Sequence, residues 1–142
     1  MKYIDEALIY CDGGCKPNPG TMVGAFLITD GENILKGPVG KNFGEGTNVV
    51  AESKAIEYAL DEAVSCTRKK VIVHCDNEFV VKALNKERRI TKGKHLKPII
   101  TAIYNKSSMF EEVVYVHVSE NNRYIKKCDA KCNELFKKLG FD

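Results

Sequence analysis

The chain has 142 residues, of which 44% are hydrophobic and 29% charged, and its formal net charge is only +3. These values predict one globular domain over residues 1–142 and exclude a disordered chain. The apolar runs are too short to span a membrane and the first residues lack an apolar signal region, so we expect a cytoplasmic protein with no membrane partner.

The hydrophobic pattern alternates between strand-like runs and helical periodicity. Strands are predicted over residues 7–12, 24–29 and 34–43, and a break at Gly37-Pro38 favours an edge position for the third. A loop with helix-capping residues leads to a helix over 50–64. Further strands are expected at 71–76 and 113–118, and further helices at 78–85, 95–107 and 124–139. This order predicts an α/β domain with a mixed sheet.

The first apolar run ends at Asp12, and a pair of glycines and a Lys-Pro-Asn-Pro-Gly turn follow it. A run buried on both faces is typical of a central strand, so the Asp12 carboxylate is expected at the edge of the core. Glycines beside it let backbone approach a ligand closely. Taken alone, the segment also fits an aspartate that caps a turn.

A second predicted strand also ends in an aspartate, because Cys75, Asp76 and Asn77 follow its apolar residues. Two strands that end in aspartate are expected to be parallel neighbours. Both carboxylates would then lie at the rim where open α/β sheets bind ligands.

Two helix carboxylates join them. Glu52 precedes Ile56 by four residues and Asp129 follows Ile125 by four, so both are expected on the buried faces of their helices. Each could pair with a lysine, but four buried carboxylates are better explained by a shared cation, because an unpaired buried charge is costly. Oxygen ligands without histidine indicate Mg²⁺ or Mn²⁺.

Six cysteines are expected to be free thiols in a reducing compartment. Cys128 and Cys132 lie four residues apart on a predicted helix, but the chain lacks the two-plus-two ligand spacing of zinc sites. A zinc site is therefore not favoured.

Together these motifs resemble the type 1 ribonuclease H family over nearly the whole chain. The matching residues are the Asp-Gly-Gly and Asn-Pro-Gly elements, the Thr-Asn loop before a helix glutamate, the strand-end aspartate before a short helix, and a final helix aspartate: Asp12, Gly13, Gly14, Asn18, Pro19, Gly20, Thr47, Asn48, Glu52, Asp76, Asn77, Glu78 and Asp129. The resemblance implies a ribonuclease H-like five-stranded mixed sheet, with its first three strands antiparallel, flanked by helices. It also implies an endonuclease that cuts the RNA strand of RNA–DNA hybrids, with two Mg²⁺ or Mn²⁺ ions held by Asp12, Glu52, Asp76 and Asp129.

Further residues are expected to contact the hybrid. They are the backbone near the first aspartate, the short polar groups around the rim, and a basic stretch: Gly13, Gly14, Cys15, Asn18, Thr47, Asn48, Asn77, Glu78, Arg88, Arg89, Lys92 and Lys94. Residues 68–97 hold ten Lys or Arg against three acids, which suits a polyanion. For any one of these residues, a turn, a helix cap or a solvated face is an equally simple explanation.

The loop over residues 118–124 departs from the family pattern. It has no histidine, and Ile125 stands where many members carry an asparagine. Asn121 or Asn122 is a candidate substitute, and the difference bears on the rate of turnover. We expect a monomer with no obligatory protein partner and no separate hybrid-binding domain.

Two alternative functions stay open. One is a degenerate member that binds nucleic acid or protein without cutting, and the other is a DNA-directed nuclease of the same fold. The four carboxylates argue against the first, because a pure binder has no need of clustered acids facing a polyanion. The Asp-Gly-Gly and Thr-Asn elements favour the RNA-directed branch over the second.

Overall fold

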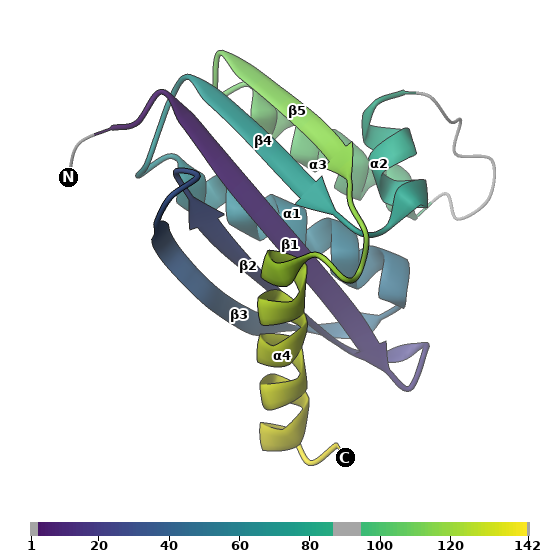
Figure 1. Cartoon of the computed structure of the whole chain (residues 1–142). Helices are drawn as coiled ribbons and strands as arrows, with labels where there is room; N and C mark the ends of the chain where they lie inside the picture. Colours follow the sequence, from purple (N-terminus) through teal and green to yellow (C-terminus); the bar gives the residue numbers. More distant parts are fainter. Residues whose placement is uncertain (1–2, 87–94, 142) are drawn as a thin grey trace.

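The computed structural model describes residues 3–86 and 95–141, and Figure 1 shows a central sheet with helices on both faces. The sheet has five strands in the order β3-β2-β1-β4-β5. Their bounds are β1 Glu6–Lys16, β2 Gly20–Thr29, β3 Ile34–Gly46, β4 Lys70–Cys75 and β5 Glu112–His117. The first three strands are antiparallel and β4 and β5 run parallel to β1, so the predicted fold class is confirmed.

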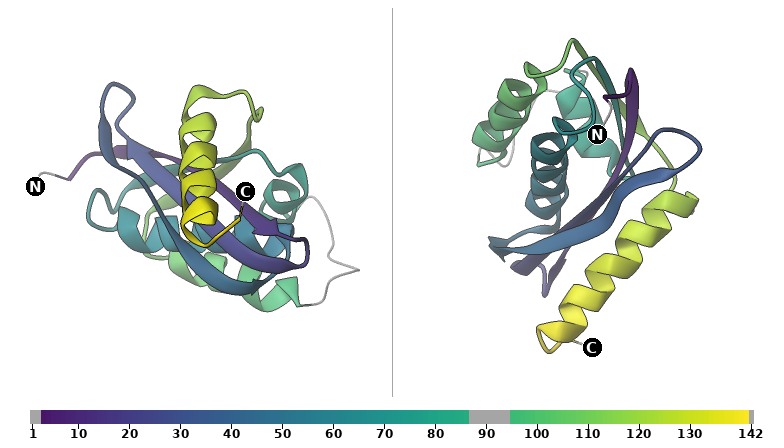
Figure 2. Two further views of the ribbon diagram at one scale, coloured as in Figure 1. Left: turned by 90° about the horizontal axis from the view of Figure 1, so that it is seen from below. Right: turned by 90° about the vertical axis from the view of Figure 1, so that its left-hand side faces the viewer.

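The helices divide between the two faces of the sheet. Their bounds are α1 Asn48–Ala63, α2 Glu78–Leu84, α3 Leu96–Ser107 and α4 Arg123–Lys138. In Figure 2, α4 lies on one face and α1, α2 and α3 lie on the other. Helix α4 contacts β1, β2 and β3, and α1 contacts β1 and β2 on the opposite side, so β1 and β2 are covered on both faces. Among the described residues, no helix has both the length and the apolar character needed to cross a membrane.

Strand β1 is longer than predicted, which changes the position of Asp12. Its parallel pairing with β4 ends at Cys11 and Cys75, but its antiparallel pairing with β2 continues to Lys16 opposite Thr21. Asp12 therefore lies inside β1, at the point where β4 leaves it, and the prediction that it ends the strand is wrong. The hydrogen bonds from β2 keep the backbone extended beyond Asp12, and the turn is confined to residues 17–19.

Gly13 serves helix packing rather than a turn. A Cβ atom at Gly13 would lie 2.7 Å from the backbone carbon and oxygen of Ala51 in α1. A glycine is needed here because only a residue without Cβ allows α1 to approach β1 so closely. This approach brings Glu52, the next residue of α1, next to the strand that carries Asp12.

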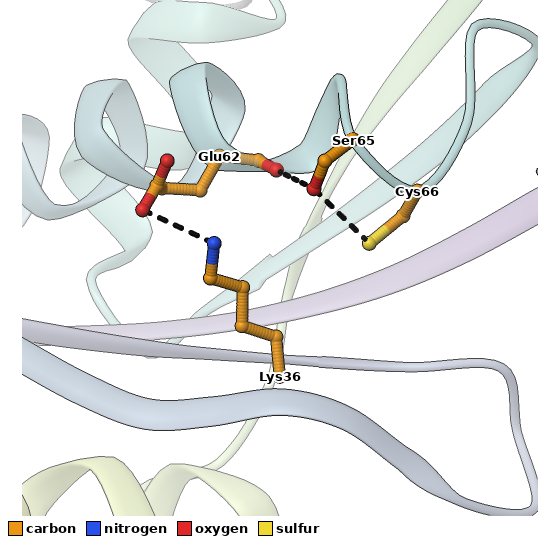
Figure 3. Close-up of polar contacts among 4 residues, drawn as sticks. All are labelled: Lys36, Glu62, Ser65 and Cys66. Carbon is orange, nitrogen blue, oxygen red and sulfur yellow. Dashed lines mark hydrogen bonds and ion pairs between the residues drawn. The ribbon is translucent and has the colours of Figure 1, made fainter. Parts of the chain in front are cut away.

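Strand β3 forms the edge of the sheet, as predicted, and polar contacts join it to α1. Lys36 Nζ lies 3.2 Å from Glu62 Oε1, and Ser65 Oγ donates to the Glu62 carbonyl at 2.9 Å (Figure 3). The Ser65 hydroxyl also lies 3.9 Å from Cys66 Sγ. All six cysteines are free, as expected, and all are buried, where a free cysteine packs as a small hydrophobic side chain.

Candidate metal and nucleic-acid site

An open cavity of about 270 Å³ lies at the rim of the sheet where β1 and β4 separate. Its lining residues come from β1, the end of β4, the loop after β5, and α4: Asp12, Gly13, Asp76, Glu120, Asn121, Ile125, Lys126 and Asp129. The structure thus places three of the predicted carboxylates, Asp12, Asp76 and Asp129, around one space. The parallel pairing of β1 with β4 explains why two of them meet there.

Glu52, the remaining predicted carboxylate, lies next to Asp76. Its side chain is buried, as the helical pattern predicted. Ligand atoms of Glu52, Cys75 and Asp76 all lie within 4.8 Å of one another. Glu52 therefore joins the acidic group from the α1 side, although it does not line the cavity itself.

Burial and mutual repulsion disfavour the charged forms of these acids. Desolvation, followed by the charges of Asp76 and Asp129, raises the pKa of Asp12 to about 8. Burial, followed by the charges of Asp12 and Asp76, raises the pKa of Glu52 well above its usual range. The pKa of Asp76 is also raised, mainly by burial and partly by Glu120 and Asp129. Shifts in this direction are typical of carboxyl groups that are buried close to other carboxyl groups.

The same residues fit a hard divalent cation. With every carboxyl group ionised, the buried Oδ1 of Asp76 has no hydrogen-bond donor among the described residues. Burial also raises the pKa of the Cys75 thiol well above its usual range, which disfavours a thiolate in the metal-free protein. The available ligands are then carboxylate oxygens, which Mg²⁺ and Mn²⁺ prefer.

Asp129 differs from its prediction in one respect. It was expected on the buried face of α4, but it is exposed, and the buried residues of that helix are Ile125, Cys128, Cys132 and Phe136. Asp129 lies at the margin of this stripe and lines the cavity. Its Oδ2 accepts a hydrogen bond of 3.4 Å from the Asn133 side chain. An exposed position at the rim suits a carboxylate that completes a metal site on its solvent side.

A groove of about 190 Å³ adjoins the cavity and shares Asp12, Gly13 and Asp129 with it. It runs between β1 and α4 and is lined by Asp12, Gly13, Gly14, Cys15, Lys16, Asn48, Asp129, Cys132, Asn133 and Phe136. Four of the predicted hybrid contacts, Gly13, Gly14, Cys15 and Asn48, are thus brought together beside the carboxylates.

Three other predicted contacts support local structure. Thr47 Oγ1 accepts from the Val50 amide at 3.3 Å and caps α1, and Asn77 Oδ1 accepts from the Val80 amide at 3.0 Å and caps α2. Asn18 Oδ1 accepts from the backbone amide of Asn48 at 3.1 Å, which ties the β1–β2 turn to the start of α1.

The remaining predicted contacts are not among the described residues that line the cavity or the groove. Glu78 is exposed and pairs with Lys82 at 2.9 Å. Arg88, Arg89, Lys92 and Lys94 lie outside the described residues. For all of these side chains, contact with nucleic acid stays a prediction.

The cavity also contains residues that the sequence patterns did not single out. Glu120 adds a fifth acid beside Asp76, and Lys126 is the only cation among the described residues that line the cavity. Asn121, one of the two candidates in the loop, lines the cavity, whereas Asn122 caps α4 by accepting from the Tyr124 amide at 2.9 Å. Loops have no periodicity from which such positions could be recognised. The only signal in the sequence was that Glu120 directly precedes Asn121, which was already a candidate.

Comparisons with known proteins agree with the observed fold. Residues 10–132 match a family model described as reverse transcriptase-like. A search of curated protein sequences found no significant match to the chain.

Several solved structures have a similar fold over nearly their whole length. RNase H1 from Halobacterium salinarum superposes with a TM-score of 0.85 at 22% identity, covering 94% of this chain and 98% of that one. The N-terminal RNase H domain of Rv2228c from Mycobacterium tuberculosis gives 0.81 at 21% identity, covering 96% and 100%. LC11-RNase H1, solved in complex with an RNA/DNA hybrid, gives 0.76 at 25% identity, covering 92% and 99%.

Proposed function

This chain belongs to the reverse transcriptase-like family, which bears out its resemblance to type 1 ribonucleases H, and we propose that it hydrolyses the RNA strand of RNA–DNA hybrids. The observation that carries the proposal is the acidic group at the sheet rim. Asp12 of β1, Glu52 of α1, Asp76 after β4 and Asp129 of α4 come from separate elements to one place. Clustered carboxylates repel one another when no cation is bound. With bound divalent cations, the same carboxylates can support hydrolysis of a phosphodiester.

We propose that these four carboxylates hold two Mg²⁺ or Mn²⁺ ions. When bound, such ions supply an activated water and stabilise the leaving oxygen of a phosphodiester. The chain's own contribution is rigidity. Asp12 is fixed by the pairing of β1 with β2, which continues beyond it, and Glu52 lies close to β1 because Gly13 has no Cβ. Asp129, on the exposed margin of α4, is the ligand nearest to solvent among the four.

We propose that the groove beside the carboxylates receives the RNA strand. The backbone of Gly13, Gly14 and Cys15 lies along it, and Asn48 stands at its side. Backbone groups and a short amide can contact a 2′-hydroxyl, which is the group that distinguishes RNA from DNA. The complex of LC11-RNase H1 with an RNA/DNA hybrid supports this substrate class. We place the whole activity in one catalytic domain over residues 1–142.

A side-by-side digestion tests the proposal. An RNA–DNA hybrid, single-stranded RNA, duplex RNA and duplex DNA are incubated at equal concentration with Mg²⁺ and with a chelator. We expect cleavage of the hybrid's RNA strand only with metal, poor cleavage of both RNA-only substrates, and intact DNA. Comparable cleavage of duplex DNA would move the assignment to a DNA-directed nuclease. Binding of the hybrid without cleavage of any substrate would support the degenerate binder.

A matched pair of variants connects this activity to the acidic group. Asp76→Asn removes one charge from the site, whereas Glu32→Gln removes one from an exposed turn between β2 and β3. We expect the first to be inactive and the second to cut like the parent.

A further inference from the structure

The Cys75 thiol lies between two parts of the acidic site. It is fully buried at the end of β4, and its Sγ donates to Glu52 Oε2 over 3.6 Å. The same sulfur accepts from the backbone amide of Asn77 at 3.5 Å. One side chain therefore connects the carboxylate on α1 with the backbone that leads from β4 into α2.

The contact with Cys75 bears on the orientation of the Glu52 side chain. With the carboxyl groups ionised, the Cys75 thiol is the only hydrogen-bond donor to the Glu52 carboxylate in the described part of the chain. A hydrogen bond to a charged acceptor is stronger than one to a neutral acceptor, even when a weak donor such as a thiol makes it.

We infer that Cys75 is a positioning residue, whose thiol holds the Glu52 carboxylate in the orientation required to bind a divalent cation together with Asp76. This inference rests on the proposed function, since the orientation of Glu52 matters only if the site binds metal. The alternative is that Cys75 merely fills space, as a buried free cysteine commonly does.

Cys11 provides a matched control for that alternative. It lies opposite Cys75 in the parallel ladder and is equally buried, with no exposed surface. Among the described residues, its thiol makes no hydrogen bond to a carboxylate. Replacing either cysteine by alanine removes a buried sulfur from the same layer of the core, so the two variants differ mainly in the contact with Glu52.

The first test measures binding of Mn²⁺ by titration calorimetry, which requires no substrate and no turnover. We expect Cys75→Ala to weaken binding by about five-fold or more, from the loss of one hydrogen bond to a charged group. Cys75→Ser keeps a donor at this position and should bind within about two-fold of the parent. Cys11→Ala should also bind like the parent. Equal affinities for Cys75→Ala and Cys11→Ala would overturn the inference.

A second test observes the thiol in the metal-free protein. The infrared S–H stretching band of Cys75 is isolated by subtracting the spectrum of Cys75→Ser from that of the parent, and the band of Cys11 is isolated in the same way. We expect the Cys75 band at lower frequency than the Cys11 band, as for a thiol that donates to the Glu52 carboxyl group, and expect Glu52→Ala to raise it. Coincident bands for the two cysteines would contradict the contact, whatever the behaviour of the alanine variants.

These readouts separate the two proposals. A parent protein that binds no Mn²⁺ and cuts no hybrid would overturn the proposed function, and with it the role of Cys75. A parent that binds Mn²⁺ and cuts the hybrid, with Cys75→Ala unchanged in metal affinity, would overturn the role of Cys75 alone.

Discussion

Cys11 of β1 pairs with Cys75 of β4, and this is the last pair of their parallel ladder. The next residue of each chain segment is an aspartate, so Asp12 and Asp76 lie side by side where the two strands separate. The charge of Asp76 contributes to the raised pKa of Asp12. A register shift of one residue between these strands would turn one carboxylate to the other face of the sheet.

Neutralising Asp76 should separate activity from stability. We expect Asp76→Asn to lower hybrid cleavage by more than the roughly 10–100-fold that loss of an outer hydrogen-bond partner of a metal ligand costs. The metal-free variant should melt a few degrees higher than the parent, because one of several like charges is removed. Cleavage assays and thermal melting with a chelator measure the two effects. An active variant would contradict the metal assignment.

The raised pKa of Asp12 predicts how stability depends on pH. A carboxyl group with a folded-state pKa of about 8 binds its proton more tightly than in the unfolded chain, whose value is 3.8. Unfolding therefore releases a proton between these values, and the free energy of unfolding should fall as pH rises through this window.

We expect the melting temperature of the metal-free protein to decrease from pH 5 to pH 8, on the order of a few kcal/mol in stability. Asp12→Asn should flatten this dependence, and Mg²⁺ should oppose it because metal binding favours the ionised form. A melting temperature that rises over the same range would show that the acids ionise freely in the folded protein.

Gly13 and Gly14 should respond differently to the same substitution. A Cβ at Gly13 would overlap the Ala51 backbone at 2.7 Å, whereas one at Gly14 would lie 3.5 Å from the Phe136 ring, an ordinary contact. We expect Gly13→Ala to destabilise the protein by about 1–3 kcal/mol, as in other overpacked cores, and to weaken metal binding by displacing α1. Gly14→Ala should change stability little. Denaturant unfolding of both variants measures the difference.

Glu120 should influence the site through its charge. It lines the cavity and contributes to the raised pKa of Asp76, so Glu120→Gln should lower that pKa and shift the acid limb of the pH–rate profile to lower pH. Metal affinity should fall by about five-fold at most, the effect of roughly 1 kcal/mol of Coulomb attraction near solvent. Glu111→Gln, which removes an exposed charge before β5, is the control. Identical pH profiles for Glu120→Gln and the parent would exclude the effect.

The basic stretch is tested by the salt dependence of binding. Neutralising Arg88, Arg89, Lys92 and Lys94 together should weaken hybrid binding and reduce the slope against salt by about 0.9 for each lost phosphate contact. Saturated turnover should change less. Neutralising Lys137 and Lys138 at the end of α4 tests whether cations elsewhere have the same effect. An unchanged slope in the first variant would mark the stretch as a solvated surface.

Local patterns in the sequence were sufficient to predict the order of strands and helices, the edge position of β3 and the inward face of Glu52. They were sufficient because hydrophobic periodicity and capping residues act over a few neighbouring positions. The parallel pairing of the two strands that carry Asp12 and Asp76 was also anticipated from sequence, because each mostly apolar run ends in Cys-Asp.

The tertiary structure decided the rest. Asp12 lies within β1 because β2 continues to pair beyond it, and no local pattern reports the length of a partner strand. Asp129 is exposed, although its helical spacing predicted burial. Helical periodicity cannot show how much of the margin of a buried stripe the neighbouring elements cover. The approach of Cys75 to Glu52 joins residues 23 positions apart, and it exists only because α1 packs against β1 over a glycine and β4 lies beside that strand.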